Sequence, residues 1–442
     1  MLVKKIGLLA TPGCRLSDLV GVEAVLGANA LTHRTLYVAE SSARVRGRLG
    51  LELVPHATFA DCPKLAVFVV GEQSPETLDD AATLAFVKRA AAQASFVIGI
   101  SNGVQLLANA GVLEGKRVTA DVDTLRRLQA HRVTAVESPT FVRDERFFTA
   151  GPSTGGIEAA FAVMKALTGD FVTKLAELTL EYNPERHFEG VEPSTPDERG
   201  LEVAVLTAPG TYLPDVIGAA DTLGALPNLR FRYVWKKTKP VRCTLGPTVV
   251  PDTTLEECPQ ADVIILGANM PALCSDPDVL SFMQRQASAA KAVICVCAGS
   301  LIVGAAGLLD GHVATSNFHM THMLERCGAT PANRELASSD KYYSAGPAIG
   351  SYEAALMVIR DLYGEGAAAH VERHALEYSP TPLFGVGSPQ LAGKFLTAVS
   401  RVALAPILPL FSHNLRRGYR ASRREEPVAL RDEKLVVRAP LR

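Results

Sequence analysis

The chain has 442 residues, a net charge of −1 and a hydrophobic content of 48%. This length suits two domains with sizeable cores, and the near-neutral charge argues against a general nucleic-acid binder, which needs a basic face. Eight cysteines without CxxC spacing indicate reduced thiols in a cytoplasmic protein, not a disulfide scaffold or a metal site.

The first segment, "VKKIGLLATPGC" at residues 3–14, predicts a β-strand and not a signal peptide, because Pro12 and Gly13 end its apolar run early. A similar segment, "LEVAVLTAPGTYLPD", returns at residues 201–215, deep inside the chain. No uninterrupted apolar run is long enough to cross a bilayer. We therefore expect a partner that is a small molecule, and neither nucleic acid nor a membrane.

The chain contains an internal duplication. "LAVFVVGEQSPE" returns as "ADVIILGANMPA", and "RFFTAGPSTGGIEAAF" returns as "KYYSAGPAIGSYEAAL", in the same order. The offset stays between 195 and 197 residues in the pairs Asp18 and Asp215, Gly71 and Gly267, Gly151 and Gly346, and Tyr182 and Tyr378. We predict a first domain over residues 1–190, a linker rich in proline and charge over 191–200, a second domain over 201–391 and a C-terminal tail over 392–442.

Each copy alternates short apolar runs with helical stretches. "DVIILGA" and "AVICVCA" are continuous apolar runs, as expected for strands buried on both faces, whereas "SYEAALMVIRDLYG" has helical periodicity. The alternation predicts two tandem flavodoxin-like α/β domains, each with a mainly parallel sheet between layers of helices. Functional sites are then expected at the carboxyl ends of the strands.

In the first copy, an apolar run reaches a corner formed by Ser101, Asn102 and Gly103, and Asp18 lies in the first loop. Serine is a poor nucleophile unless a base activates it, and the nearby segment "VTADVDTLRRL" contains no histidine. We interpret Ser101, Asn102 and Asp18 as a degenerate site, kept for architecture or ligand binding, and a serine enzyme is the alternative.

In the second copy, Asp215 lies where the first loop becomes a helix. An aspartate at this position either caps the helix or exchanges protons with a nearby nucleophile. The residue pattern leaves both roles open.

The equivalent corner of the second copy contains a thiol. The strand "AVICV" ends at Cys297, and "GSLIVGAAGLL" begins as a helix, so the side chain projects above the sheet edge as in a nucleophile elbow. The helix N-terminus is expected to lower the pKa of the thiol and to hold an anion. A small buried apolar cysteine is the alternative. We assign oxyanion or substrate binding to four neighbours, Ala298, Gly299, Gly267 and Gly346.

These segments, with "AAGLLDGHVATSNF" and "LEYSPTPLFGVGSP", resemble the ThiJ/PfpI superfamily over residues 3–190 and 201–390. Within it they are similar to the isonitrile hydratases and to relatives fused to AraC-type regulators. The resemblance implies a class-I glutamine-amidotransferase-like fold and a lyase without metal or organic cofactor. Cys297 would attack an isonitrile to give a thioimidate, Asp215 would transfer protons, and water would release an N-substituted formamide.

The resemblance also implies that the two copies pair as an intramolecular pseudo-dimer, and it leaves a further homodimer open. The sequence departs from the hydratase pattern at Ala298, where a threonine is expected, and at Asn317, where histidine is common. His319 and His322 match no motif position. Two alternatives remain: a glyoxalase- or deglycase-like enzyme, which Asp215 disfavours because that branch uses glutamate, and a non-enzymatic ligand or redox sensor.

The tail contains "FLTAVSRVALAPILPLF" and then "RRGYRASRREE". Prolines and an arginine interrupt the apolar stretch, so we expect it to dock on the protein surface, with the following arginines solvated. A basic amphipathic contact with a membrane surface is the minor alternative. The tail is too short for the paired helix-turn-helix module of an AraC-type regulator.

Overall fold

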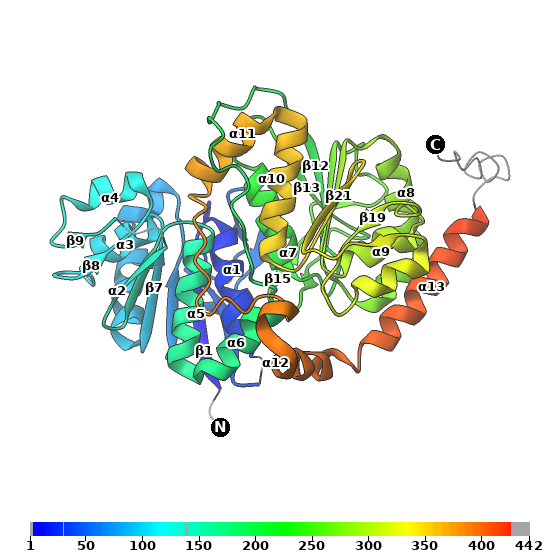
Figure 1. The fold of residues 1–442 in the computed structure, drawn as a ribbon. Coiled ribbons are helices and arrows are strands. Elements are labelled where there is room, and N and C mark those ends of the chain that lie inside the picture. Colours follow the sequence, from blue (N-terminus) through cyan, green and yellow to red (C-terminus); the bar gives the residue numbers. More distant parts are fainter. Residues whose placement is uncertain (1–2, 30, 138–139, 426–442) are drawn as a thin grey trace.

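The structure is a computed structural model and describes residues 3–29, 31–137 and 140–425. Two α/β domains lie side by side, and the C-terminal helices run along one edge of both (Figure 1). The last part of the predicted tail, residues 426–442, lies outside the described residues.

Each domain is built on a seven-stranded sheet that is parallel except for one antiparallel edge pair. The first sheet has the order β10 (Phe141–Asp144), β11 (Phe147–Ala150), β7 (Phe96–Ile100), β6 (Val67–Val70), β1 (Lys4–Leu9), β2 (His33–Ala39) and β5 (Ala57–Thr58). The second has the order β21 (Leu336–Ser339), β22 (Tyr342–Ala345), β18 (Ala292–Val296), β17 (Val263–Leu266), β12 (Glu202–Leu206), β13 (Arg230–Trp235) and β16 (Thr253–Thr254). The two orders are equivalent, which confirms the predicted α/β fold in two tandem copies.

Helices cover these sheets because the central strands, such as β6 and β17, are buried on both faces and need an apolar layer on either side. The helices of the first domain are α1 (Leu16–Gly27), α2 (Ala81–Gln93), α3 (Gly103–Asn109), α4 (Val122–Leu128), α5 (Thr154–Thr168) and α6 (Asp170–Thr179). Those of the second are α7 (Leu213–Leu223), α8 (Pro277–Ala289), α9 (Gly299–Ala305), α10 (Ile349–Tyr363) and α11 (Glu365–His370). The tail forms α12 (Pro389–Leu404) and α13 (Leu408–Glu425).

The two domains share a small sheet that neither copy forms alone. Its order is β14 (Val241–Arg242), β15 (Thr248–Val250), β4 (Glu52–Val54) and β3 (Val45–Arg46), so β4 of the first domain pairs with β15 of the second. Helix α1 also packs against α7 across the boundary, and one continuous apolar core includes residues of both domains. The domains therefore form a single packed unit.

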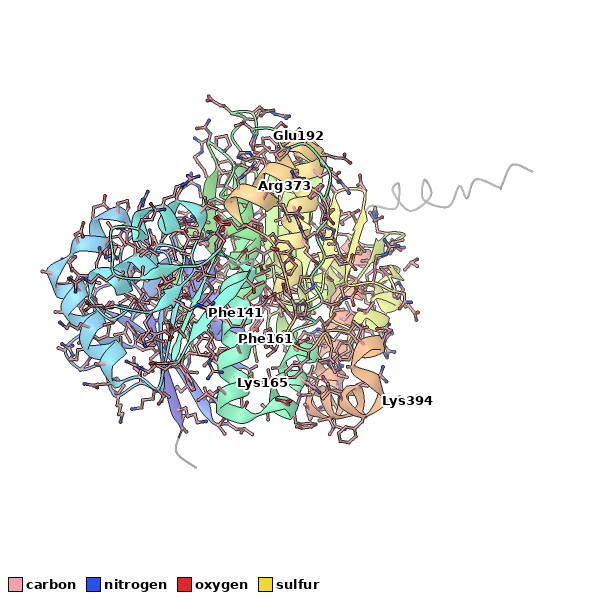
Figure 2. All side chains as sticks on the ribbon, turned by 60° about the vertical axis from the view of Figure 1, so that its left-hand side comes forward. Phe141, Phe161, Lys165, Glu192, Arg373 and Lys394 are labelled. Atoms are coloured by element: carbon pink, nitrogen blue, oxygen red, sulfur yellow. The ribbon has the colours of Figure 1, made fainter. Side chains whose placement is uncertain are left out.

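The segment between the domains has no helix or strand over residues 188–201 and lies against the second domain. Arg373 donates hydrogen bonds to the carbonyl groups of Phe188 at 3.1 Å and Val191 at 2.7 Å, and Figure 2 shows it near Glu192. These contacts attach the connecting segment to the second domain.

The tail helices pack on the protein as expected from the sequence. Helix α12 contacts α6 of the first domain, and α13 contacts α9 of the second. In the described part of the chain, no single helix is long and apolar enough to cross a membrane, although α12 and α13 together have the length and composition and are bent by 64°.

Candidate active site

The thiol of Cys297 lies at a strained corner between β18 and α9. Its φ angle is 56°, in the left-handed region that non-glycine residues seldom adopt, and its N–H donates to the carbonyl of Ala345 at 2.8 Å. Gly299 lets the start of α9 lie close to the end of β17, because a Cβ atom there would be 2.7 Å from the carbonyl oxygen of Leu266. Strain of this kind is typical of functional sites, and it fits the predicted nucleophile elbow.

Asn317, Ser316 and Ala298 also contact Cys297. The Nδ2 of Asn317 donates to Sγ at 3.2 Å, and Ser316 Oγ donates to the Cys297 carbonyl at 2.7 Å. The N–H of Ala298 also contacts the thiol, while the methyl group of Ala298 packs in the apolar core. The amide of Asn317 therefore takes the place of the histidine expected from the family pattern, and only the backbone of Ala298 serves the site.

The thiol is neutral at rest. Burial raises the pKa of Cys297 well above its ordinary value, and the nearby charge of Asp215 raises it further, whereas the hydrogen bond from Asn317 lowers it. The expected lowering by the helix N-terminus is thus outweighed by burial. A partner that accepts the thiol proton is required before the sulfur can attack.

Asp215 is fully buried at the start of α7 and is held by two backbone groups. Its Oδ2 accepts from the N–H of Ala268 at 2.8 Å, and its Oδ1 accepts from the N–H of Ala348 at 2.8 Å. It does not cap α7, because both donors belong to loops that follow β17 and β22. Burial raises the pKa of Asp215 to about 7, although these two hydrogen bonds lower it. A carboxyl group with this pKa can accept or donate a proton near neutral pH.

Gly267 and Gly346 make room for carboxyl groups. A Cβ atom at Gly267 would overlap the side chain of Asp215, and one at Gly346 would lie 3.0 Å from Oε2 of Glu181. Both positions were assigned to oxyanion or substrate binding from the sequence. The structure places them beside the two acids of the site.

Glu181 is the residue that sequence reasoning missed. It belongs to the first domain, just after α6, but its Oε1 accepts from the N–H of Phe318 in the second domain at 2.9 Å. Its side chain is buried and its φ angle is 47°. The pKa of Glu181 is raised to about 8, mainly by burial and also by the charges of Glu335 and Asp215. The hydrogen bond from Phe318 lowers this pKa but does not offset the burial.

The exchange between domains is reciprocal. Glu377, the equivalent residue of the second copy, has a φ angle of 43°, and its Oε1 accepts from the N–H of Val122 in the first domain at 3.1 Å. A Cβ atom at Gly151 would lie 3.3 Å from its Oε2. The signal for this exchange was the repeated "LEYNP" and "LEYSP", although the repeat alone does not show that each glutamate enters the other domain.

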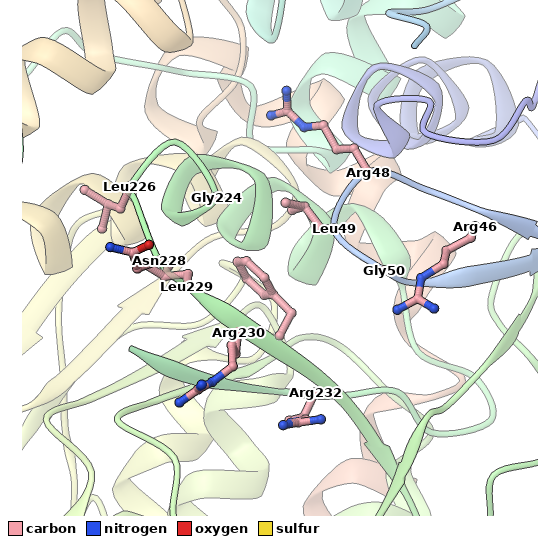
Figure 3. Close-up of a pocket in the computed structure, with 11 residues that line it drawn as sticks. Arg46, Arg48, Leu49, Gly50, Gly224, Leu226, Asn228, Leu229, Arg230 and Arg232 are labelled. Carbon is pink, nitrogen blue, oxygen red and sulfur yellow. The ribbon is translucent and has the colours of Figure 1, made fainter. Parts of the chain in front are cut away.

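A cavity of about 430 Å³ opens beside Glu181 and Ser316, and neither Cys297 nor Asp215 is among the residues that line it. It is lined by Glu181, Ser316, Phe318, Arg334, Glu335 and Arg401, among others. Carboxyl and guanidinium groups therefore both contribute to its lining. A second cavity of about 410 Å³, at the domain boundary, is lined by Arg46, Arg48, Arg230 and Arg232 and includes none of the predicted site residues (Figure 3).

The first-domain site has the same corner but a different electrostatic environment. Ser101 has a φ angle of 51° and is buried, and its Oγ has no hydrogen-bond partner among the described residues. Asn102 is tied to the backbone of Gln73, accepting from its N–H at 2.7 Å. Asp18 accepts from the N–H of Glu72 at 2.9 Å. These contacts are compatible with the predicted degenerate site.

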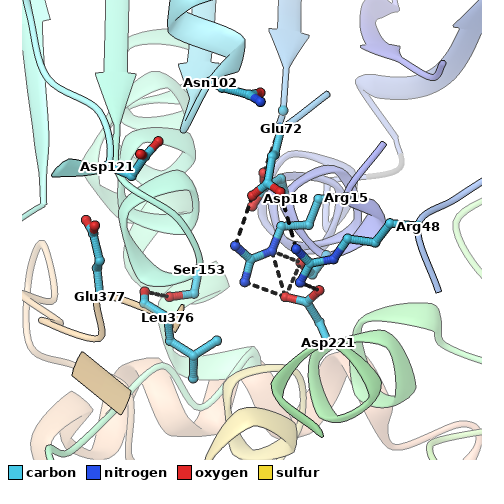
Figure 4. Close-up of polar contacts among 12 residues, drawn as sticks. Arg15, Asp18, Arg48, Glu72, Asn102, Asp121, Ser153, Asp221, Leu376 and Glu377 are labelled. Atoms are coloured by element: carbon cyan, nitrogen blue, oxygen red, sulfur yellow. Dashed lines mark hydrogen bonds and ion pairs between the residues drawn. The ribbon is translucent and has the colours of Figure 1, made fainter. Parts of the chain in front are cut away.

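An ion-pair cluster lies beside Asp18 (Figure 4). Arg15 pairs with Asp221 of the second domain at 2.6 Å and with Glu72 at 3.2 Å, and Arg48 pairs with the same two carboxylates. Burial alone would raise the pKa of Asp221, but the positive charges of Arg15 and Arg48 hold this pKa below its ordinary value. The cluster therefore joins the two domains through ion pairs. In the second copy, the residue equivalent to Arg15 is the uncharged Tyr212.

Among the described residues, no group of three or more His, Cys, Asp or Glu side chains could hold a metal ion. An α/β fold with a thiol at a strand-to-helix elbow and a buried carboxyl group beside it defines a class of cysteine-dependent enzymes. The DJ-1/PfpI family model matches residues 4–166 and 201–360, and the chain belongs to this family.

Several known proteins are similar to parts of this chain. The isonitrile hydratase of Pseudomonas putida is 35% identical over 212 residues, which are 48% of this chain and 92% of that protein. The glutathione-independent glyoxalase DJR-1.2 of Caenorhabditis elegans is 26% identical over 155 residues, or 34% of this chain and 82% of that protein. A THiJ/PfpI family protein structure from Pseudomonas syringae has 27% identity and a TM-score of 0.45, covering 53% of this chain and 96% of its own.

Proposed function

We propose that the second domain hydrates a small electrophile, with an isonitrile as substrate and an N-substituted formamide as product. The observation that carries this proposal is the buried neutral thiol of Cys297 beside two carboxyl groups with pKa values of about 7 and about 8, on Asp215 and Glu181. The similarity to an isonitrile hydratase supports the choice of substrate.

In the first half of the reaction, the Asp215 carboxylate accepts the proton of the Cys297 thiol. The sulfur forms a bond to the terminal carbon of the isonitrile, and Asp215 returns the proton to that carbon, giving a thioimidate. The thiol proton thus ends on carbon, and the charge of the enzyme is unchanged. The N–H of Ala298 and the amide of Asn317 stabilise the sulfur while it is anionic.

In the second half, water adds to the carbon of the thioimidate. Glu181, which is mostly protonated at pH 7, donates to the nitrogen, and the C–S bond breaks to release the formamide and the thiol. One water molecule is consumed and the proton on Glu181 is replaced from that water. The two domains act here as an intramolecular pseudo-dimer, supported by the shared sheet and by Glu181.

Because the chain is also similar to a glyoxalase, the test includes a second reaction, the conversion of methylglyoxal to lactate. Redox sensing is disfavoured, because oxidation of cysteine follows thiolate character and the thiol of Cys297 is buried and neutral.

The test compares wild type with Cys297→Ala, Asp215→Asn, Glu181→Gln and Ser101→Ala. Each is incubated with an alkyl isonitrile and with methylglyoxal, and formamide and lactate are followed. We expect formamide from wild type and Ser101→Ala, none from Cys297→Ala, and a loss of about 10²- to 10⁴-fold in Asp215→Asn. Lactate in place of formamide would favour the glyoxalase chemistry, and equal rates in wild type and Cys297→Ala would refute both.

A further inference from the structure

Between residues 389 and 423 the tail helices carry basic charges only, and Glu425 at the end of α13 is their one acidic residue. Residues 389–423 contain no aspartate or glutamate, in a chain with nearly equal totals of 45 basic and 46 acidic residues. Their cations are Lys394, Arg401, Arg416, Arg417, Arg420 and Arg423. Among the side chains that the structure describes, only Arg423 of these lies within salt-bridge distance of a carboxylate, 2.8 Å from Asp310. The segment therefore presents a concentrated positive charge.

Exposed apolar side chains gather on the same helices. Of ten large hydrophobic side chains that the described residues expose, four lie between residues 391 and 410, and a fifth is adjacent. The five are Phe171, Leu391, Phe395, Val402 and Leu410, and the rings of Phe171 and Phe395 are 6.2 Å apart. Phe395 and Val402 are each 73% exposed and are seven residues apart, which places them on one side of α12.

The opposite sides of both helices are fixed to the protein. In α12, Leu396 and Ser400 are buried, and Ser400 Oγ lies 3.2 Å from Nε2 of His319. In α13, Phe411 and Leu415 are buried against the second domain. The outward face is therefore displayed without any unfolding, and Figure 2 shows Lys394 at the outer edge of α12.

We propose that this outward face, formed by the exposed side chains of α12 and α13, binds the surface of an anionic membrane. An amphipathic helix with aromatic and aliphatic side chains between cations lies in the plane of such a surface. The two helices are bent by 64° and α13 is anchored to the second domain, so they lie on the membrane and do not cross it. This departs from the sequence-based expectation that membrane contact is minor.

Charge selects the anionic lipid surface over a second copy of the chain. A two-fold contact through this face would set the same cations against each other, because both subunits of such an interface use the same patch. Negatively charged headgroups neutralise the cations, while the acyl region accepts Phe395 and Val402. A single anionic membrane surface can therefore bind both α12 and α13.

The proposed face adjoins the cavity lined by Glu181 and Ser316. Pro389, Gln390 and Arg401 line that cavity and also a neighbouring, mostly apolar groove of about 610 Å³ along α12. Binding would bring the mouth of the cavity next to the headgroups. The binding itself does not depend on the proposed activity.

The test is co-sedimentation of the full chain with vesicles of phosphatidylcholine, alone or with about 30 mol% phosphatidylglycerol. We expect binding to the anionic vesicles only, and release at about 1 M salt. Replacing two cations in Arg416→Gln/Arg417→Gln should weaken binding about thirtyfold, and Phe395→Glu/Val402→Glu should abolish it. Leu31→Glu, which changes a side chain 92% exposed on the first domain, is the matched control and should bind like wild type.

Circular dichroism checks that each variant remains folded. We expect Phe395→Glu/Val402→Glu to fold because both side chains are exposed. The proposal is overturned if wild type ignores the anionic vesicles, or if the variants bind as wild type does. It is also overturned if light scattering shows a wild-type dimer that Phe395→Glu/Val402→Glu converts to a monomer, because a second copy would then cover the face.

Discussion

Replacing Glu181 with glutamine should make the protein more stable at neutral pH while impairing the site. An unfolded glutamate releases its proton near pH 4.5, whereas burial keeps the proton on Glu181 until about pH 8. The folded chain therefore holds a proton that the unfolded chain has lost, and folding becomes less favourable as the pH rises from 4.5 to 8. About 2.5 pH units at about 1.4 kcal/mol per unit give about 3 kcal/mol at pH 7.

Glutamine has nearly the same shape as glutamate and does not ionise, so Glu181→Gln avoids the loss of folding stability that wild type suffers as the pH rises. Its free energy of unfolding should match that of wild type near pH 4.5 and exceed it by about 3 kcal/mol at pH 7. Urea denaturation between pH 4.5 and 8 measures the difference, with the fluorescence of Trp235, the single tryptophan, and far-ultraviolet circular dichroism as probes.

The control is Glu189→Gln, a nearby residue whose side chain is 78% exposed, which should follow wild type at every pH. If the stability difference between Glu181→Gln and wild type stays constant from pH 4.5 to 8, then Glu181 is not the buried neutral acid inferred here. Its proposed role as a proton donor would be refuted by the same result.

Three further predictions concern the groups around the two sites. Asn317→Ala removes the hydrogen bond to the thiol, so alkylation of Cys297 by iodoacetamide should slow about 10- to 100-fold at pH 7 and its pH profile should move to higher pH. Gly267→Ala would displace Asp215 and should lower kcat about 100-fold with an unchanged circular dichroism spectrum. Arg15→Met leaves Asp221 and Glu72 without their buried partner and should cost about 3–5 kcal/mol in urea denaturation, whereas the exposed Arg126→Met should change stability by less than about 1 kcal/mol.

The fold could be predicted because its signals are local and repeated. Buried strands such as β17 and β18 appear as continuous apolar runs, and the offset of about 196 residues shows that the pattern occurs twice. The elbow at Cys297 was visible for the same reason, since a strand end, two small residues and a helix start follow each other directly.

The parts of the site that could not be predicted from the sequence depend on long-range contacts. Glu181 and Phe318 are 137 residues apart and belong to different domains, so no spacing rule brings them together. The strands of the shared sheet contain two or three residues each, too few to show an alternating pattern. The raised pKa of Cys297 likewise arises from burial by many segments, which the adjoining helix N-terminus did not reveal.

Under the proposed function, the reciprocal exchange of glutamates gives a reason to retain a first domain with serine at its elbow. Glu181 reaches the Cys297 site only because α6 and the segment after it are held against the second domain. That position is fixed by β4 pairing with β15, and by Arg15 pairing with Asp221 beside the serine corner itself. In the proposed reaction, a first domain without a thiol at its elbow still supplies the acid Glu181 to its neighbour, and removing the whole domain would remove both Glu181 and the strand that orients it. In the proposed reaction, the duplicated copy without a thiol is part of the active site of the other.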